Sequence, residues 1–175
     1  MSAAPAIVWL NGNLVPVDQA VVSVYDRGFT SGDGVFETIK VVNGVPFALS
    51  RHLRRLAESS HIIGFTPPSD SQLRQAVSEA IDANIARLGD LGRLRITLTA
   101  GRPHGSASVP TRNDSGLTLV LTADPQTPHP TELNVVSVPW PRNDRGPLVG
   151  AKTTSYADNL AVLEQVRQKG ADEAL

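Results

Sequence analysis

Two Asn-Gly pairs, each placed between two short apolar runs, constrain the fold of this 175-residue chain more than any other feature. The pairs are Asn11-Gly12, between runs 7–10 and 14–17, and Asn43-Gly44, between runs 35–42 and 45–49. Asn-Gly tolerates the positive φ that a two-residue turn between antiparallel strands requires. The sequence therefore predicts two β-hairpins.

The spacing of apolar residues becomes helical after the second hairpin. Ser50 is a plausible cap of a first helix that Gly64 ends, and Ser69 or Asp70 caps a second helix. Further strands are predicted at 21–25, 94–98, 117–121 and 133–138, and a last helix ends at Gly170. This pattern indicates an α+β domain, with an antiparallel sheet and two helices, followed by the start of a second unit.

The domain boundaries follow from a segment with three prolines and no periodicity. We expect an N-terminal α+β domain over 1–123, a linker over 124–131, and the start of an α/β domain over 132–175. The last five residues, Ala171 to Leu175, look like the beginning of a strand with no polar tail after it. We therefore expect this chain to be part of a longer protein, truncated at Leu175.

Composition excludes several classes of function. The formal net charge of −1 gives no basic patch for nucleic acid or for an anionic membrane surface. The absence of cysteine excludes disulfides, thiolate nucleophiles and thiolate metal sites, and the four histidines show no metal-ligand spacing. Without a signal sequence or a long apolar stretch, we expect a cytoplasmic protein.

Lys152 is the strongest candidate for covalent chemistry. It is one of three lysines, it lies between small residues, and a run of hydroxyl side chains follows it. A lysine amine can form a Schiff base when it is partly desolvated or lies near positive charge, whereas arginine stays protonated. The alternative is an ordinary solvated lysine in a loop, and the local sequence alone favours that alternative.

Three segments, at 26–38, at 51–56, and at 150–159 followed by 170–175, together resemble the class IV pyridoxal-phosphate enzymes. This family includes D-amino-acid and branched-chain aminotransferases and 4-amino-4-deoxychorismate lyase. The resemblance implies that Lys152 is the Schiff-base lysine and proton shuttle, that the cofactor is pyridoxal 5'-phosphate, and that the protein is a homodimer. It also implies that the acid facing the pyridine nitrogen, and the rest of the phosphate site, lie beyond Leu175.

The resemblance assigns two more residues to the cofactor. Arg55 ends a His-x-x-Arg-Leu pattern and matches the family's arginine on the cofactor phosphate; its alternative is a solvated helix arginine beside Arg54. Tyr156 lies four residues after Lys152, where it would donate to the phenolic oxygen of the cofactor; its alternative is packing of the ring.

Four residues are candidates for the substrate pocket. Strand alternation puts Phe36 and Thr38 on one face and Glu37 on the other, so the first two would line the pocket or pack in the core. Arg102 and His104 have the Arg-x-His spacing that D-amino-acid aminotransferases use on the substrate carboxylate, but they fall early in the loop.

The resemblance leaves the reaction open. We expect 4-amino-4-deoxychorismate lyase activity, which gives pyruvate and the 4-aminobenzoate used in folate biosynthesis. The alternatives are an amino acid transaminase, branched-chain or D-specific, and a noncatalytic scaffold. The small-molecule substrate is then an amino acid or aminodeoxychorismate.

Overall fold

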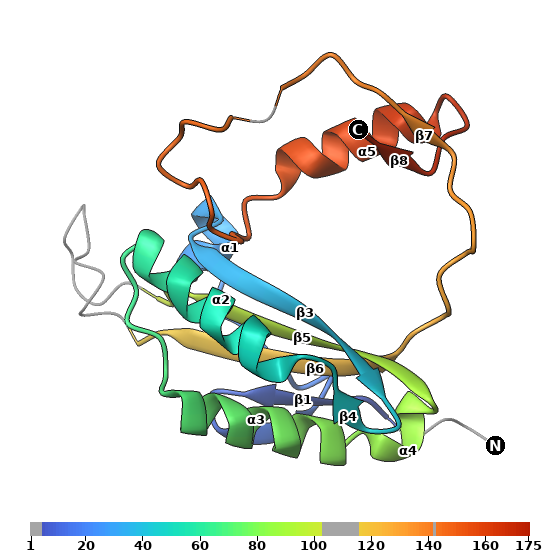
Figure 1. Ribbon diagram of the computed structural model, residues 1–175. Coiled ribbons are helices and arrows are strands. Elements are labelled where there is room, and N and C mark those ends of the chain that lie inside the picture. The colour runs from blue at the N-terminus through green and yellow to red at the C-terminus, as the bar shows by residue number, and fades with distance from the viewer. Residues whose placement is uncertain (1–4, 103–115, 142) are drawn as a thin grey trace.

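The computed structural model describes residues 5–102, 116–141 and 143–175, and its main feature is a six-stranded antiparallel sheet in the order β2-β1-β6-β5-β3-β4 (Figure 1). In chain order the elements are β1 (Ile7–Leu10), β2 (Asn13–Pro16), α1 (Arg27–Ser31), β3 (Gly34–Val42), β4 (Val45–Pro46), α2 (Leu49–Ile62), α3 (Asp70–Asp82), α4 (Ile85–Leu88), β5 (Leu91–Thr99), β6 (Thr118–Pro125), β7 (Val135–Val136), α5 (Ala157–Arg167) and β8 (Glu173–Ala174). The predicted α+β class is confirmed.

Both predicted hairpins are present. Asn11 and Gly12 have φ values of 48° and 91°, and Asn43 and Gly44 have 48° and 77°. Positive φ at both central residues is the geometry that matches the right-handed twist of antiparallel strands. These turns connect β1 to β2 and β3 to β4, and they set the register of each pair.

Helices α2 and α3 cover one face of the sheet. Helix α3 begins as predicted, because the Ser69 hydroxyl accepts from Gln72 N and the Gln72 side chain accepts from Ser69 N. The predicted cap of α2 is wrong: Ser50 lies inside the helix, and the N-cap is Ala48 with φ 51°. The shared core includes Val35, Ile39, Leu53, Leu56, Leu73, Val77, Leu94, Ile96, Leu98 and Leu121.

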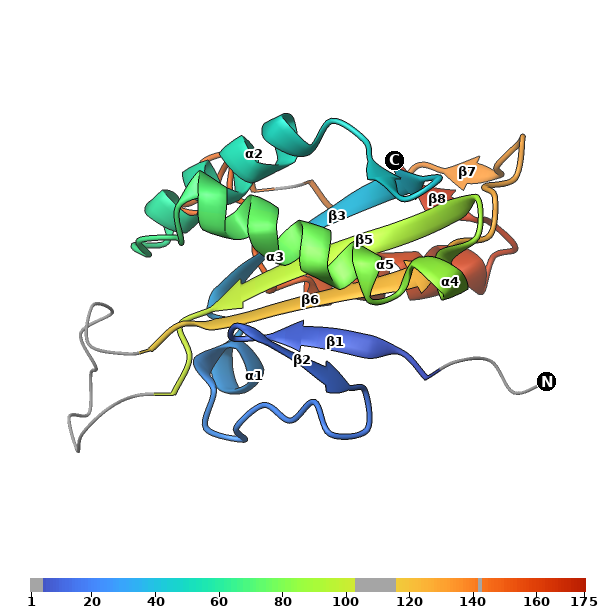
Figure 2. The same ribbon diagram turned by 90° about the horizontal axis from the view of Figure 1, so that it is seen from below.

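The C-terminal segment lies on the opposite side of the sheet. Figures 1 and 2 agree that the sheet lies between α3 and α5. Strand β7 pairs in parallel with β8, and α5 packs against β8. Two predicted strands differ from the structure, because 21–25 has no strand and 133–138 contributes only β7. Among the described residues, no helix has both the length and the apolar character needed to cross a membrane.

Candidate active site

The chain around Lys152 is attached to the outer edge of β3 through backbone atoms. Phe36 N donates to Lys152 O at 3.0 Å, and Thr154 N donates to Gly34 O at 2.8 Å. The amide of Lys152 donates to the hydroxyl of Ser59, on α2, at 3.0 Å. Backbone contacts to the sheet and to α2 therefore position Lys152, while its side chain takes part in none of them.

The Lys152 amine lies among aromatic rings. Its Nζ is 4.0 Å from the centre of the Phe36 ring and 3.4 Å from the hydroxyl of Tyr156. The two rings meet edge to face, with their centres 5.3 Å apart. Tyr156 is the N-cap residue of α5, and its ring lies beside the Lys152 side chain, four residues earlier in the chain. The structure thus brings together Lys152, Tyr156 and Phe36, three of the predicted site residues.

Arg95 adds a second cation to this cluster, and the sequence analysis missed it. Its guanidinium carbon is 3.9 Å from the centre of the Phe36 ring, and its Nε donates to the Thr97 hydroxyl at 3.2 Å. Burial lowers the pKa of the Arg95 guanidinium, and repulsion from Arg93 acts in the same direction. Within the part of the chain that the structure describes, no carboxylate lies within ion-pair distance of Arg95.

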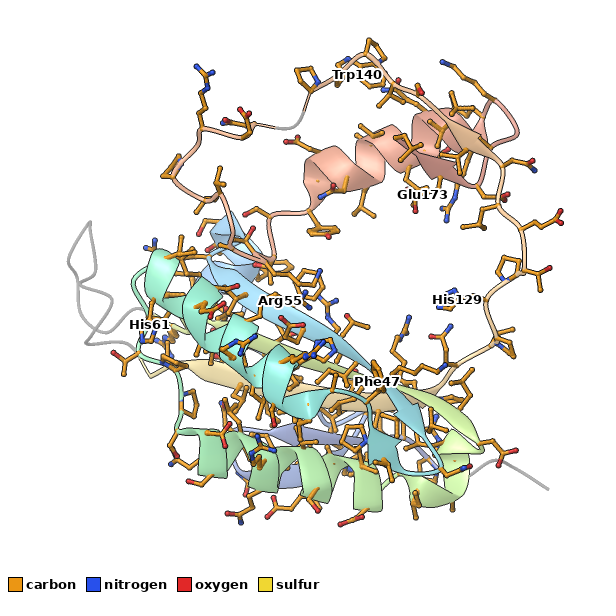
Figure 3. The ribbon with its side chains drawn as sticks, in the orientation of Figure 1. Phe47, Arg55, His61, His129, Trp140 and Glu173 are labelled. Atoms are coloured by element: carbon orange, nitrogen blue, oxygen red, sulfur yellow. The ribbon has the colours of Figure 1, made fainter. Side chains whose placement is uncertain are left out.

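Arg55 lies where α2 meets β3 (Figure 3), and it is bound to a buried acid. Its Nε donates to Glu37 Oε1 at 2.6 Å and its Nη2 donates to Glu37 Oε2 at 2.5 Å. His52 Nδ1 is 2.8 Å from Glu37 Oε2. Hydrogen bonding to Glu37 and the negative charge of that carboxylate raise the pKa of Arg55, although burial opposes the shift.

The remaining predicted residues divide into two groups. Thr38 is half-buried and is the cross-strand neighbour of Arg95, on the same face of the sheet as Phe36. Arg102 is exposed just beyond β5, and His104 lies outside the described residues. Among the residues that the structure describes, no group of three or more His, Cys, Asp or Glu could hold a metal ion.

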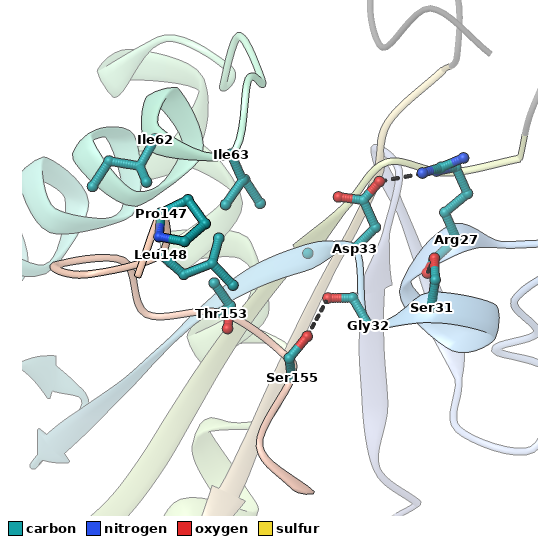
Figure 4. A pocket seen from close by; sticks show the side chains of 11 residues that line it. Arg27, Ser31, Gly32, Asp33, Ile62, Ile63, Pro147, Leu148, Thr153 and Ser155 are labelled. Atoms are coloured by element: carbon teal, nitrogen blue, oxygen red, sulfur yellow. Dashed lines mark hydrogen bonds and ion pairs between the residues drawn. The ribbon is translucent and has the colours of Figure 1, made fainter. Parts of the chain in front are cut away.

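A separate cavity lies beside the Lys152 segment, between α1 and the end of α2 (Figure 4). Its volume is about 420 Å³, and its lining includes the ion pair between Arg27 and Asp33. Thr153 and Ser155 line this cavity, whereas Lys152 does not. The cavity is therefore distinct from the cluster around the amine.

The sequence contained a signal for only one of the missed residues. Alternation with the apolar side chains of β5 places Arg95 on the face opposite the core, which is the face that carries Phe36 and Thr38. Glu37 was correctly assigned to the face opposite Phe36, but its pairing with Arg55 and His52 joins a strand to a helix. Such a pair depends on the packing of two elements, so no local pattern predicts it.

Comparison with known proteins is consistent with this geometry. The sequence model described as amino-transferase class IV matches residues 34–175. The chain is 30% identical to a D-alanine aminotransferase of Bacillus licheniformis over 96% of this chain and 58% of that protein. It is also 30% identical to a bifunctional aminodeoxychorismate lyase / D-amino acid transaminase of Mycobacterium tuberculosis, over 97% of this chain and 59% of that protein.

A solved structure gives the same result for the fold. The PLP-bound form of a hypothetical aminotransferase from Mycobacterium tuberculosis superposes with a TM-score of 0.81 and 26% identity. The superposition covers 97% of this chain and 61% of that one. The chain thus spans about three fifths of the length of the relatives that it matches.

Proposed function

The chain belongs to the class IV aminotransferase family, and we propose that it is part of a pyridoxal-phosphate enzyme that eliminates pyruvate from 4-amino-4-deoxychorismate. Transfer of an amino group between amino acids and keto acids is the alternative reaction. The observation that carries the proposal is that Lys152 and Tyr156 lie together beside β3, while Arg55 is bound to Glu37 of the same strand. These three side chains suit three polar groups of the cofactor: its aldehyde, its phenolic oxygen and its phosphate.

The donor set fits the cofactor that this family uses, pyridoxal 5'-phosphate. Lys152 offers a primary amine for the aldehyde, and the Tyr156 hydroxyl, 3.4 Å from that amine, suits the phenolic oxygen. Arg55 offers a guanidinium, whose planar donors match phosphate oxygens in geometry and in charge. When bound, the cofactor supplies an aldehyde that captures amines and a ring that withdraws electrons from the bond to be broken.

Lys152 has two tasks in this proposal. Its amine would hold the cofactor covalently, and it would move a proton at the reacting carbon of the substrate as general base and acid. The backbone contacts of Lys152 to β3 and α2 support both tasks, because they orient the amine without using its side chain. Tyr156 and Phe36 flank the amine and exclude part of the surrounding water.

Arg95 would bind a carboxylate of the substrate. It is half-buried, it shares the Phe36 ring with Lys152, and it has no carboxylate partner among the described residues. A desolvated guanidinium without a counter-ion attracts an anion strongly. Arg95→Gln should raise the KM for the substrate at least tenfold, as the loss of a charged hydrogen bond of about 1.5–3 kcal/mol implies. An unchanged KM would remove Arg95 from the substrate site.

One observation supports the lyase over a D-specific transaminase: by the resemblance to the family, Phe36 stands where D-specific relatives carry a phenol. A relative named as a bifunctional aminodeoxychorismate lyase / D-amino acid transaminase is compatible with either reaction. Amino-group transfer stays the second candidate because another relative is a D-alanine aminotransferase. Both reactions would use the same lysine, so the distinction depends on the substrate.

Product analysis with each substrate class tests the reaction. The lyase should release pyruvate from 4-amino-4-deoxychorismate without an amino acceptor, whereas a requirement for a keto acid would show the transaminase. Borohydride reduction of the holoprotein, followed by peptide mass analysis, should place the pyridoxyl group on Lys152. Label on Lys40 or Lys169, or no uptake of cofactor by the protein, would contradict the proposal and favour a noncatalytic scaffold.

The same proposal includes a cytoplasmic homodimer. Light scattering at working concentration tests the dimer, and a monomer would contradict it. The domain division at 124–131 is also a proposal, which limited proteolysis within that segment would support.

A further inference from the structure

We infer that Glu37 is a positioning residue that aims Arg55 at the phosphate of the cofactor. The inference rests on the proposed function and adds to it a residue that does not itself touch the cofactor. The two partners differ in burial: the Glu37 side chain is 0% exposed, whereas the Arg55 side chain is 48% exposed. The pair therefore runs from a buried acid to an open guanidinium.

The contacts of Glu37 explain how the arginine is oriented. Nε and Nη2 of Arg55 donate to separate oxygens of the carboxylate, which fixes the plane of the guanidinium as well as its position. His52, which lies on α2 like Arg55, has its Nδ1 2.8 Å from Oε2 of Glu37 and gives the carboxylate a further contact. The buried acid thus holds a side chain that would otherwise sample many rotamers.

The pairing also determines which donors of Arg55 remain. A guanidinium has five N–H donors, and Glu37 takes one from Nε and one from Nη2. The remaining donors are the two on Nη1 and the outer one on Nη2, which form the end of the guanidinium. A phosphate would therefore meet Arg55 end-on, at an edge whose direction Glu37 sets.

Arg54 provides an internal comparison on the same helix. Its side chain is 72% exposed, and its Nε is 3.7 Å from the exposed carboxylate of Glu58, a spacing typical of weak surface pairs. Among the residues that the structure describes, no buried acid pairs with Arg54. Of these adjacent arginines, only Arg55 is held in place before a ligand binds. A phosphate ligand benefits from being held in this way, because a preorganised donor loses less entropy on binding.

The test separates positioning from a purely structural role by comparing two ligands. Dissociation constants for pyridoxal phosphate and for pyridoxal, which lacks the phosphate, are measured by absorbance titration. The proteins are the wild type, Glu37→Gln, Arg55→Gln, the double variant, and Glu58→Gln as the matched control. Glu37→Gln keeps the shape of the side chain but presents an amide N–H group to the donors of Arg55.

We expect Glu37→Gln to weaken pyridoxal phosphate binding by about tenfold, as the loss of a hydrogen bond to a charged group implies. Pyridoxal binding should be unchanged, and the double variant should be no weaker than Arg55→Gln, because Glu37 acts only through Arg55. Glu58→Gln should match the wild type for both ligands. Glu37→Asp, which keeps the charge but withdraws it by one methylene, should repeat the phosphate-specific loss.

Four results would overturn the inference, and only the last of them would also overturn the proposed function. Equal losses for both ligands would make Glu37 structural, and additive losses in the double variant would show that it does not act through Arg55. A phosphate-specific loss in Arg55→Gln alone would remove Glu37 but leave the proposed function intact. If the wild type binds neither ligand, the proposed function and the inference fail together.

Discussion

Replacing Asp26 should cost more stability than any surface substitution, because this acid joins α1 to two strands. It is 1% exposed and accepts from Gly28 N, from the Thr99 hydroxyl and from the Thr118 hydroxyl, each at 2.7 Å. Thr99 lies at the end of β5 and Thr118 at the start of β6. Asp26→Ala removes all three acceptor contacts at once.

The magnitude follows from these contacts. Losing the N-cap of α1 costs about 1 kcal/mol. The buried Thr99 hydroxyl loses its charged partner, which adds about 1–2 kcal/mol, and the half-buried Thr118 adds less because water can replace the acid. The free energy of unfolding should therefore fall by about 3 kcal/mol, equivalent to about 6–12 °C in Tm for a chain of this size.

Urea unfolding followed by tryptophan fluorescence and far-ultraviolet circular dichroism measures this loss. Asp26→Asn, which keeps one acceptor oxygen, should lose about half as much, and Asp18→Asn, at an exposed turn, should stay within about 0.5 kcal/mol of the wild type. If Asp26→Ala loses less than about 1 kcal/mol, the three contacts do not hold the acid in solution and the reasoning is refuted.

Two further predictions concern the attachment of the Lys152 segment. Gly32→Ala should destabilise the protein by about 1–2 kcal/mol and slow cofactor uptake, because φ is 66° there and a Cβ would lie 2.6 Å from the Ser155 hydroxyl. Adding Ser155→Ala to this variant should recover part of the lost stability. If nothing is recovered, the contact with Ser155 is not the source of the strain. Ser59→Ala should cost about 1–2 kcal/mol and lower the yield of borohydride-trapped Lys152, because the Lys152 amide loses its acceptor. Ser60→Ala is the matched control, since the Ser60 hydroxyl donates only to a carbonyl of its own helix, and equal loss of trapping in both variants would contradict the role of Ser59.

Local chemistry made the hairpins and one helix start predictable. The Asn-Gly pairs and the Ser69 cap act through atoms only a few residues apart, so the sequence is sufficient to specify them. The start of α2 was mispredicted at Ser50, because the chain turns through a left-handed Ala48 that follows from the β3–β4 hairpin. The segment 21–25 is rich in β-branched residues but forms no strand, although β2 is the end strand of the sheet.

The site was predictable only in part, because some of its residues are indicated by motifs and others depend on contacts between separate elements. Lys152, Tyr156 and Phe36 are near one another in the structure, and motifs in the sequence had indicated each of them. Alternation along β5 indicates the face on which Arg95 lies, but its contact with Phe36 and the pairing of Glu37 with Arg55 both join separate elements. Such contacts depend on the packing of the whole domain, which single-sequence patterns do not encode.

The pairing of the Lys152 segment with β3 has a consequence for aggregation. Over residues 34–36 that segment is the only cover of the outer edge of β3 among the described residues, and Thr153 forms a β-bridge with Val35. An uncovered edge offers free N–H and C=O groups to a strand from another molecule. The stretch that carries the reactive amine therefore also shields the sheet from intermolecular pairing, and its release would expose a surface prone to self-association.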